Sequence, residues 1–324
     1  MINIIKKLFN NIFSIQDYNK THILIKFIGI KFKFLKYKFN LAKKQSPYYT
    51  YKKLYNDITK VPPADGELRQ IQLANLVLLD ELDYVCRTNN IPYWLDGGTL
   101  LGAVRHKGFI PWDDDIDVGM LSQDYANLVD IFNKSSRDDN IYADLCYGDE
   151  KSDILLIKIK HKLCPHLFVD IFPFYNYGKI INSEEQIKQT KNIKRYRKKI
   201  KKDICSTKDK NELFVFFQNK MKNDIVSNVE NTENNESNLV WGIEYNHKWN
   251  NWFTNHDVIF PLKSIVFEGK EYMSMNNPDA FLSRVYGNYM DYPDKITCGH
   301  SLYKCDDEEF ECIRKLALIN NAVR

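Results

Sequence analysis

The sequence predicts an α+β protein in which a mixed β-sheet is flanked by helices. Apolar residues recur at helical spacing across residues 66–88. Apolar runs typical of short strands lie at 93–95 and 167–172, and residues 154–160 alternate as a strand does. A second helical stretch, rich in Lys, is predicted at 183–222. The chain has 324 residues, which is enough for one large domain or two small ones.

The first helix is predicted from a single apolar face, formed by Ile71, Ala74, Leu78, Leu82 and Val85. It can end at Asn89 or Asn90, because Asn tolerates the left-handed backbone conformation.

Polar segments predict the connections between elements. Residues 133–140 are expected to form a loop, and residues 223–238, rich in Asn, Glu and Ser, a mobile loop. Nearer the C-terminus, Asn277 can cap a helix that opens at Pro278 and ends at Gly287. The aromatic C-terminal third is where we expect a sugar pocket.

Composition sets limits on location and partners. The chain is 44% hydrophobic and 27% charged, and its net charge of +4 is too mild to favour nucleic acid as a partner. The N-terminus lacks the pattern of a signal peptide, and no apolar run approaches the roughly 20 residues that span a bilayer. We therefore expect a cytoplasmic protein whose seven Cys are reduced.

Basic residues gather at the N-terminus and at 188–202, and residues 1–60 are predicted to be a basic N-terminal extension. Residues 25–34 alternate apolar and basic side chains, as a strand with one cationic face does. That pattern fits an edge strand whose Lys prevent aggregation. The alternative is peripheral contact of residues 1–50 with anionic lipid at the inner face of the membrane. The segment 62–66 marks a boundary.

Four carboxylates stand within five residues, at Asp113, Asp114, Asp115 and Asp117. They repel each other unless a positive charge lies among them. If the following apolar residues make a strand, Asp113, Asp115 and Asp117 share one face and Asp114 points the other way. Hard oxygen ligands without His or Cys favour Mg²⁺ or Mn²⁺. The alternatives are an exposed acidic loop and a Ca²⁺ loop, but the spacing of an EF-hand is absent.

A phosphate-binding function is suggested by the residues before the acids. Gly97 and Gly98 let backbone amides approach a phosphate, and Thr99 adds a hydroxyl donor. Three basic residues then follow, Arg105, His106 and Lys107. Arg and Lys can hold phosphate oxygens. His106 either contacts a phosphate or has a structural role. Glycines, cations and acids in this order are the parts of a phosphoryl-transfer site, although no P-loop or kinase signature is present.

The stretch from Tyr93 to Met120 resembles the LicD family, relatives of the fukutin and fukutin-related proteins. The likeness is carried by residues 97–105 and 108–117. It continues, more weakly toward the end, at 66–88, 168–173, 267–269 and 286–289. The resemblance implies a polymerase-β-like nucleotidyltransferase fold for a catalytic domain at 61–324. That domain would consist of a core at about 66–180, a helical insertion at about 183–238 and a C-terminal part at 239–324.

The resemblance also implies an activity. Such enzymes move a phosphorylated alcohol, of the phosphocholine or polyol phosphate type, from a CDP-activated donor to a glycan hydroxyl and release CMP. The glycan would belong to lipo-oligosaccharide, capsule or a teichoic-type polymer. Asp115 and Asp117 match the metal-binding Asp-x-Asp of the superfamily, Asp170 matches its third carboxylate, and Asp113 is an auxiliary candidate. A nucleotidyltransferase that moves the nucleotide half, and a non-catalytic scaffold in glycan assembly, are the alternatives.

The remaining roles follow from this assignment. Asp170 is a candidate general base for the acceptor hydroxyl. Arg105 and Lys107 would hold donor phosphates. Lys158 either reaches the donor or lies on an exposed strand face.

Several cysteines are candidate ligands for a second metal ion. Cys298, Cys305 and Cys312 are spaced by seven residues, and Cys164 and His166 flank a Pro. Because some fukutin relatives carry zinc, the resemblance leaves a structural Zn²⁺ site open. The spacing lacks a Cys-x-x-Cys pair, so buried free thiols are the favoured interpretation.

Overall fold

The computed structural model of the protein describes residues 13–17, 22–27, 30–35, 52–147, 154–206, 209–226, 237–293 and 305–323. Two compact units are distinguished along the chain. The first comprises residues 1–58 with 294–296, and the second comprises residues 59–293 with 297–324.

The first unit contains a three-stranded antiparallel sheet made of β1 (Phe13–Asp17), β2 (His22–Phe27) and β3 (Ile30–Leu35). The alternation at 25–34 is confirmed as β-structure, but it is divided between two strands. Their register pairs Ile25 with Phe32 and Lys26 with Lys31. The side chains of residues 1–51, on which the lipid-contact alternative depends, lie outside the described residues.

The second unit begins with helices and strands that alternate along the chain: α4 (Gly66–Thr88), β4 (Tyr93–Leu95), α5 (Gly97–His106), β5 (Ile116–Leu121), α6 (Ser122–Tyr125), α7 (Leu128–Ser135), β6 (Ile141–Tyr147), β7 (Leu155–His161) and β8 (Cys164–Asn176). It continues with α8 (Ser183–Lys199), α9 (Lys201–Ser206), α10 (Lys210–Lys220), η3 (Met221–Ile225), β9 (Asn238–Trp241), β10 (Phe253–Asn255), α11 (His256–Ile259), β11 (Lys263–Phe267), β12 (Lys270–Ser274), α12 (Pro278–Tyr286) and α13 (Asp307–Val323).

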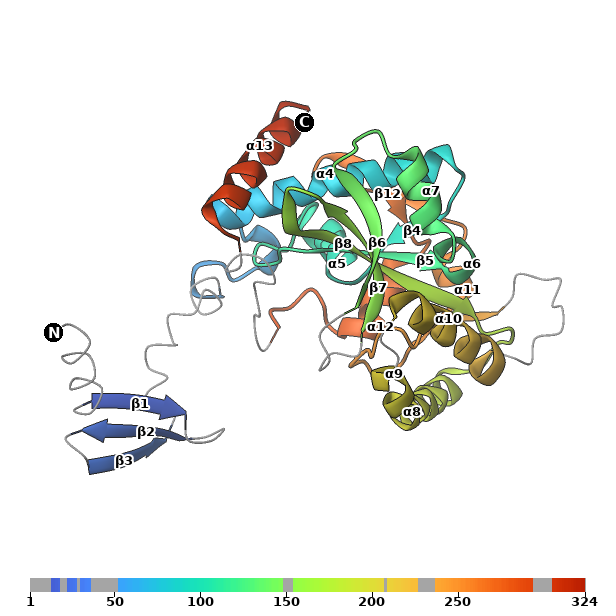
Figure 1. Ribbon diagram of the computed structural model, residues 1–324, viewed down its shortest axis with the longest axis horizontal. Helices are drawn as coiled ribbons and strands as arrows, with labels where there is room; N and C mark the ends of the chain where they lie inside the picture. The colour runs from blue at the N-terminus through green and yellow to red at the C-terminus, as the bar shows by residue number, and fades with distance from the viewer. Residues whose placement is uncertain are drawn as a thin grey trace. The chain divides into compact units, whose positions relative to one another are not determined.

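The main sheet is built around β8, its longest strand. β8 pairs in parallel with β5 along one edge. Along the other edge it pairs antiparallel with β7 over its first half and with β9 over its second half. β4 and β10 extend the sheet on either side, and β6 pairs with β7. The predicted α+β class with a mixed sheet is therefore confirmed, and helices flank the sheet (Figure 1).

The long helix α4 has the predicted bounds and the predicted buried face. Ile71, Leu78 and Val85 are each 0% exposed, and Asn90 just after the helix adopts a positive φ of 55°. The C-terminal helix α13 packs along α4 and also contacts β8 (Figure 1). α4 is thus covered on two sides, which explains why its sequence is apolar at so many positions.

Three local predictions need correction. Strand β5 begins at Ile116, so Asp113 and Asp115 lie in the preceding loop and the strand-face argument applies to Asp117 alone. Residues 133–135 are helical because Phe132 is buried and holds the last turn of α7 against the sheet. Strand β8 extends well beyond the predicted 167–172.

Other local predictions are confirmed. The basic stretch at 183–222 is helical, although it is divided into α8, α9 and α10 with the start of η3. Asn277 caps α12 through its side chain, which accepts from the N–H of Ala280 (3.1 Å), and Gly287 ends the helix at φ 69°. The predicted mobile loop at 223–238 is wrong at its ends, because 223–225 belong to η3 and 238 begins β9, and its residues 227–236 lie outside the described residues. Cys298 lies outside them as well.

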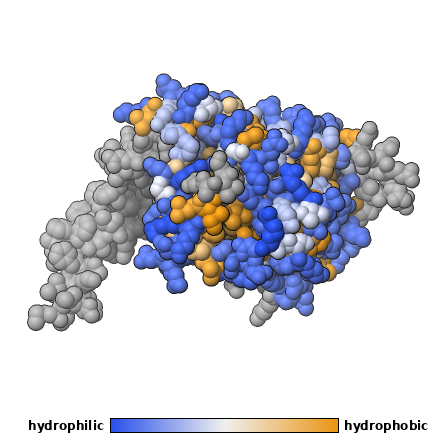
Figure 2. Space-filling view, turned by 90° about the horizontal axis from the view of Figure 1, so that it is seen from above, coloured by the Kyte–Doolittle hydropathy of each residue, from blue (hydrophilic) through white to orange (hydrophobic). Residues whose placement is uncertain are grey.

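The surface is mainly hydrophilic on the face shown in Figure 2, with apolar side chains gathered near its centre. Among the helices of the described residues, none combines the length and the apolar character needed to cross a bilayer.

Candidate active site

Three charged side chains form a row across neighbouring strands of the main sheet. The parallel register of β5 and β8 places Asp117 opposite Asp170. The antiparallel register of β7 and β8 places Lys158 opposite Asp170 from the other side. Paired residues project from the same face of a sheet, so the three side chains meet. The Nζ atom of Lys158 lies 2.6 Å from Oδ1 of Asp170.

The start of helix α5 fits against these acids because its first two residues are glycines. A Cβ atom at Gly97 would lie 2.4 Å from Oδ2 of Asp117, and one at Gly98 would lie 2.6 Å from Oδ2 of Asp113. Gly97 also has a positive φ of 50°. The N–H of Gly98 donates to Oδ2 of Asp117 (3.2 Å). The glycine pair therefore brings the positive end of a helix dipole close to carboxylates.

Two further contacts connect α5 with β5. Asp96 caps the helix, and its side chain accepts from the N–H of Gly97 (2.8 Å). Thr99 was expected to donate to a phosphate, but its Oγ1 accepts from the N–H of Asp117 (2.8 Å). The hydroxyl thus fixes the strand that carries the acid.

The acidic loop before β5 is held from α4. The side chain of Gln72 donates to the carbonyl of Asp113 (2.7 Å), and that of Asn75 donates to the carbonyl of Asp114 (2.8 Å). Asn75 also accepts from the N–H of Phe168 (3.1 Å), so one side chain ties the loop to β8. Asp114 is 1% exposed and does not line the cavity described next, although its carboxylate lies within 4.8 Å of those of Asp113 and Asp115.

A cavity of 410 Å³ opens over the row of charges. Its polar end consists of Asp96, Gly97, Asp115, Asp117, Lys158 and Asp170. Its apolar end consists mainly of aromatic residues, Tyr147, Phe168, Phe172, Tyr245, His247, Trp249 and Tyr286. The sequence led us to expect a sugar pocket in the aromatic C-terminal third but named none of its residues, and Tyr245, His247, Trp249 and Tyr286 come from that third. Asp96 was also missed, although an Asp between a strand and a glycine-rich helix start is a typical cap.

The aromatic wall is itself organised by stacking. The ring of His247 lies 4.5 Å from that of Trp241 and 5.0 Å from that of Trp249, and all three are nearly parallel. The basic helix α8 holds this segment, because Lys194 donates to the carbonyl of Trp249 (2.5 Å) and Arg197 to the carbonyl of Ile243 (2.7 Å). These two members of the basic block at 188–202 therefore support the cavity wall.

Burial strongly affects titration in the cavity. Burial, together with the charges of Asp115 and Asp170, raises the pKa of Asp117 well above its ordinary value. Burial raises the pKa of Asp96 to about 6. Burial, with the charge of Asp117, also raises the pKa of Tyr286 well above its ordinary value, so its hydroxyl stays protonated and can donate at neutral pH. A carboxylate cluster of this kind is stable in its charged form only beside a cation.

The donor set fits a hard divalent cation. Carboxylate oxygens of the consecutive residues Asp113, Asp114 and Asp115 lie within 4.8 Å of one another. Asp117 and Asp170 face each other from adjacent strands. Oxygen ligands without thiol or imidazole suit Mg²⁺ or Mn²⁺. Asp115, Asp117 and Asp170 line the cavity, whereas Asp113 does not.

The predicted basic phosphate ligands lie elsewhere. Arg105 is 7% exposed, and its guanidinium donates to the carbonyl of Tyr289 (2.5 Å) and to Nε2 of His106 (2.9 Å). Burial and the charge of Arg105 lower the pKa of His106 to about 4, so its ring is neutral. Lys107 ends α5 with a positive φ of 59°, and its carbonyl accepts from the N–H of Glu268 (2.9 Å). None of the three lines the cavity.

Glu268 explains why residues 267–269 take part in the resemblance. Its carboxylate forms two hydrogen bonds with Arg69 of α4 (2.9 and 2.7 Å) and accepts from the N–H of Phe109 (3.0 Å). A Cβ atom at Gly108 would lie 2.3 Å from this carboxylate. The turn between β11 and β12 therefore braces the segment that leads into the acidic loop.

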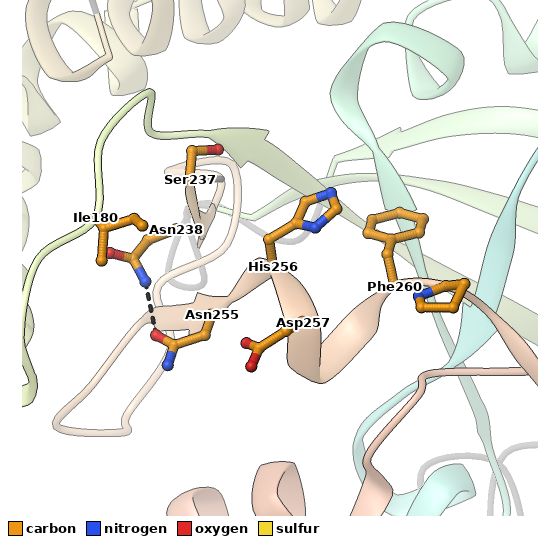
Figure 3. Close-up of a pocket in the computed structure, with 8 residues that line it drawn as sticks. Ile180, Ser237, Asn238, Asn255, His256, Asp257 and Phe260 are labelled. Atoms are coloured by element: carbon orange, nitrogen blue, oxygen red, sulfur yellow. Dashed lines mark hydrogen bonds between the residues drawn. The ribbon is translucent and has the colours of Figure 1, made fainter. Parts of the chain in front are cut away.

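Two other hollows differ from the cavity in chemistry. One of 590 Å³ lies beside β9 and β10, where Asn238 donates to Asn255 (2.7 Å) near His256 and Asp257 (Figure 3). It is larger than the cavity over the acids but has no carboxylate cluster, so we place the chemistry at the smaller one. The second, of 470 Å³, shares His247 with the cavity and is lined by Lys194, Arg197, Lys198, Lys201, Asn246 and Lys248.

The raised pKa of Asp117 predicts how metal-free stability depends on pH. The folded protein binds this proton at pH values where the unfolded chain, with a pKa of about 3.9, has lost it. The contribution of Asp117 to the free energy of unfolding therefore falls as pH rises above about 4. In EDTA, wild type should lose stability relative to Asp117→Asn as pH rises from about 4 toward neutral. Urea unfolding of both proteins measures this difference, and parallel curves would contradict it.

Known proteins resemble the chain in the region of this site. The sequence-family model described as the LicD/FKTN/FKRP nucleotidyltransferase domain matches residues 90–206 of this chain. The lipopolysaccharide cholinephosphotransferase LicD of Haemophilus influenzae is 31% identical over 257 residues, which cover 70% of this chain and 92% of that protein. The chain belongs to the LicD family.

Two further relatives match shorter stretches of the chain. The ribitol 5-phosphate transferase FKRP of Homo sapiens is 33% identical over 92 residues, which cover 28% of this chain and 18% of that protein. The ribitol-5-phosphate transferase FKTN of Mus musculus is 49% identical over 35 residues, covering 11% of this chain and 8% of that protein. All three relatives are phosphotransferases by name. The present protein is accordingly a LicD-type phosphotransferase.

Proposed function

We propose that the protein transfers a phosphorylated alcohol, of the phosphocholine or polyol phosphate type, from a CDP-activated donor to a hydroxyl of a cell-surface glycan. CMP is the other product. One observation carries this proposal: Asp117, Asp170 and Lys158 stand in one row beneath a cavity that Asp115 also lines. Carboxylates for a cation and an ammonium for phosphate oxygens are what phosphoryl transfer requires.

The polar end of the cavity holds the reacting phosphates. Asp115, Asp117 and Asp170 would hold Mg²⁺ or Mn²⁺, which when bound would offset the charge of the donor phosphates. Among the described residues that line the cavity, Lys158 is the one Lys or Arg, and it is placed to hold a phosphate oxygen. The start of α5 at Gly97 favours an anion through its dipole. These groups fix the donor with its phosphorus exposed to the acceptor.

The transfer exchanges one phosphorus–oxygen bond for another. The oxygen of the acceptor hydroxyl attacks the phosphorus that carries the alcohol. A new phosphorus–oxygen bond forms, and the bond to the CMP phosphate breaks with its electron pair on CMP. Asp170, paired with Lys158, takes the proton of the acceptor hydroxyl as general base.

The aromatic wall and the basic hollow beside it suit the two substrates. The partly exposed rings of Tyr245 and Trp249 can stack on a base or a sugar. Lys198, Lys201 and Lys248 line the hollow that shares His247 with the cavity, and they would attract an anionic acceptor glycan. The acceptor would thus approach from the side of α8.

Labelled CDP-choline tests this proposal. With Mg²⁺ and a surface glycan, we expect CMP release and transfer of the choline label to the glycan. Both should stop in excess EDTA and return with added Mg²⁺. Release of phosphocholine with nucleotide on the glycan would instead establish the nucleotidyltransferase alternative. No reaction with any CDP-activated alcohol would favour the scaffold, against which the mutual repulsion of the buried carboxylates argues.

We place the catalytic part of the chain at residues 61–324, with a polymerase-β-like nucleotidyltransferase core. A protein that uses a cytoplasmic nucleotide donor would act at the inner face of the membrane, where residues 1–50 could contact anionic lipid.

A further inference from the structure

The segment that carries much of the aromatic wall leaves the main sheet along one edge of β8. β7 pairs with this edge over the first half of β8, and β9 pairs with it over the second half. The chain passes between these strands just after β9. There the N–H of Gly242 donates to the carbonyl of Pro173 (2.9 Å), and the N–H of Leu155 donates to the carbonyl of Glu244 (3.1 Å). The next residues along the chain belong to the aromatic wall.

A carboxyl group is buried at this passage. Glu244 is 0% exposed. Its Oε1 accepts from the hydroxyl of Tyr175 in β8 (2.5 Å), whereas its Oε2 accepts no hydrogen bond from any of the described residues. A Cβ atom at Gly242 would lie 2.0 Å from Oε2 and 2.9 Å from Cε2 of Tyr175, so the chain closes tightly over the pair. Burying a carboxyl with one unsatisfied oxygen costs free energy, and the cost is largest when the group is charged.

The surroundings of Glu244 oppose its negative charge. Burial raises its pKa to about 7, although the hydroxyl of Tyr175 and the charge of Arg197 in α8 favour the ionised form. Arg197 also donates to the carbonyl of Ile243 (2.7 Å). Burial and the charge of Glu244 raise the pKa of Tyr175 and that of Tyr125 in α6. Glu244 therefore changes charge near neutral pH beside two hydroxyls that stay protonated.

Glu244 and the residue after it contact different faces of β8. Successive side chains of a strand alternate between its faces, so Tyr175 projects away from the face that carries Asp170 and Phe172. Glu244 binds Tyr175, whereas the ring of Tyr245 packs at 5.3 Å from that of Phe172 in the cavity. Glu244 thus has no contact with the reacting groups, yet a shift of its backbone moves the aromatic wall.

We propose that Glu244 is a positioning residue for the aromatic wall, which it holds in place when protonated and loosens when ionised. The neutral carboxyl fits the close packing around Gly242. An ionised carboxylate favours contact with water, which the closed passage excludes. Ionisation therefore favours an opening at residues 242–244, and the wall moves with it. The inference rests on the proposed function, in which the wall stacks on the substrates.

Intrinsic fluorescence of the full chain tests the proposal without any substrate. The ring of Trp249 is stacked 5.0 Å from that of His247, so movement of the wall changes its emission. In wild type we expect a step with its midpoint near pH 7, the pKa of about 7 that burial gives Glu244, and Trp249→Phe should remove the step. Glu244→Gln has the shape and charge of the protonated carboxyl and should abolish it.

Two further variants separate positioning from mere packing. Tyr175→Phe removes a hydrogen bond that favours the ionised form of Glu244, so it should shift the midpoint to higher pH. Glu81→Gln alters a second buried carboxyl, which binds Arg137, and should keep the wild-type step. No step in wild type, or an unchanged step in folded Glu244→Gln, would overturn the proposal. The wild-type curve and Tyr175→Phe decide the question if Glu244→Gln does not fold.

Transfer provides a second readout. At pH 8 about a tenth of the chains keep the proton on Glu244, so the KM for CDP-choline should rise about tenfold between pH 6 and pH 8 in wild type. It should stay level over this range in Glu244→Gln. An equal rise in both proteins would contradict the positioning role. Absence of transfer at every pH would overturn the proposed function instead, and the fluorescence step would distinguish the two failures.

Discussion

Replacing Asp117 with Asn is expected to slow transfer by at least about 10³-fold while the protein stays folded, a loss of about 4 kcal/mol in transition-state stabilisation. Asn keeps the size of Asp and can still accept from the N–H of Gly98, as Oδ2 of Asp117 does (3.2 Å). It lacks the negative charge that a divalent cation requires. The change therefore removes a metal ligand and leaves the contact with α5 in place.

The measurement is the rate of CMP release at saturating Mg²⁺, with circular dichroism to confirm folding. Asp115→Asn should behave in the same way, because Asp115 lines the same cavity. Asp130→Asn, on the exposed side of α7, is the matched control and should keep wild-type activity. If folded Asp117→Asn retained more than about a tenth of the wild-type rate, the assignment of the metal ligands would be wrong.

The helix 66–88 could be predicted because its signals are local. Its apolar spacing depends on residues a few positions apart, and Asn90 adopts the left-handed conformation for which Asn is suited. The pair Gly97-Gly98 was also recognised, but for a different reason from the one the structure gives. The sequence suggested close approach to a phosphate. The structure shows close approach to the carboxylates of Asp117 and Asp113, a tertiary contact that no local pattern contains.

The position of Asp115 was not predicted correctly by the strand period. A strand period placed Asp113, Asp115 and Asp117 on one face, yet β5 begins only at Ile116. The loop before it is shaped from α4, where Gln72 and Asn75 hold its carbonyls. These partners lie about forty residues earlier in the chain, as the separations of 41 and 39 show. Where a strand begins therefore depends on contacts that periodicity does not reveal.

Arg105 shows why nearness in sequence did not predict nearness in the site. It stands eight positions before Asp113, but the face of α5 on which it lies turns its guanidinium to the carbonyl of Tyr289. The aromatic wall presents the opposite case. Tyr245, His247 and Trp249 lie far from the acids in sequence. The pairing of β9 with β8 and the hydrogen bonds from α8 hold their segment at the cavity.

The second large effect is expected at Lys158. Its ammonium lies 2.6 Å from Asp170, with side chains that are 25% and 15% exposed, and 3.8 Å from the centre of the Phe168 ring. Replacing Lys158 with Met keeps the length of the side chain and its contact with that ring, but removes the charge. We expect transfer to fall about 10²-fold, the usual cost of one lost donor to a developing charge. Lys158→Arg should recover part of the rate.

Lys160 provides the matched control for this experiment. It projects from the same face of β7 two residues further along, opposite Phe168, and does not line the cavity. Lys160→Met should therefore leave transfer within about twofold of wild type, a change of well below 1 kcal/mol in activation free energy.

If Lys158 holds the donor, its loss raises the KM for the CDP-activated substrate as well as lowering kcat. If it acts only by orienting Asp170, kcat falls alone and its dependence on pH shifts. Equal activity of the two Met variants would exclude both roles, because charge on that strand face would then have no part in the reaction.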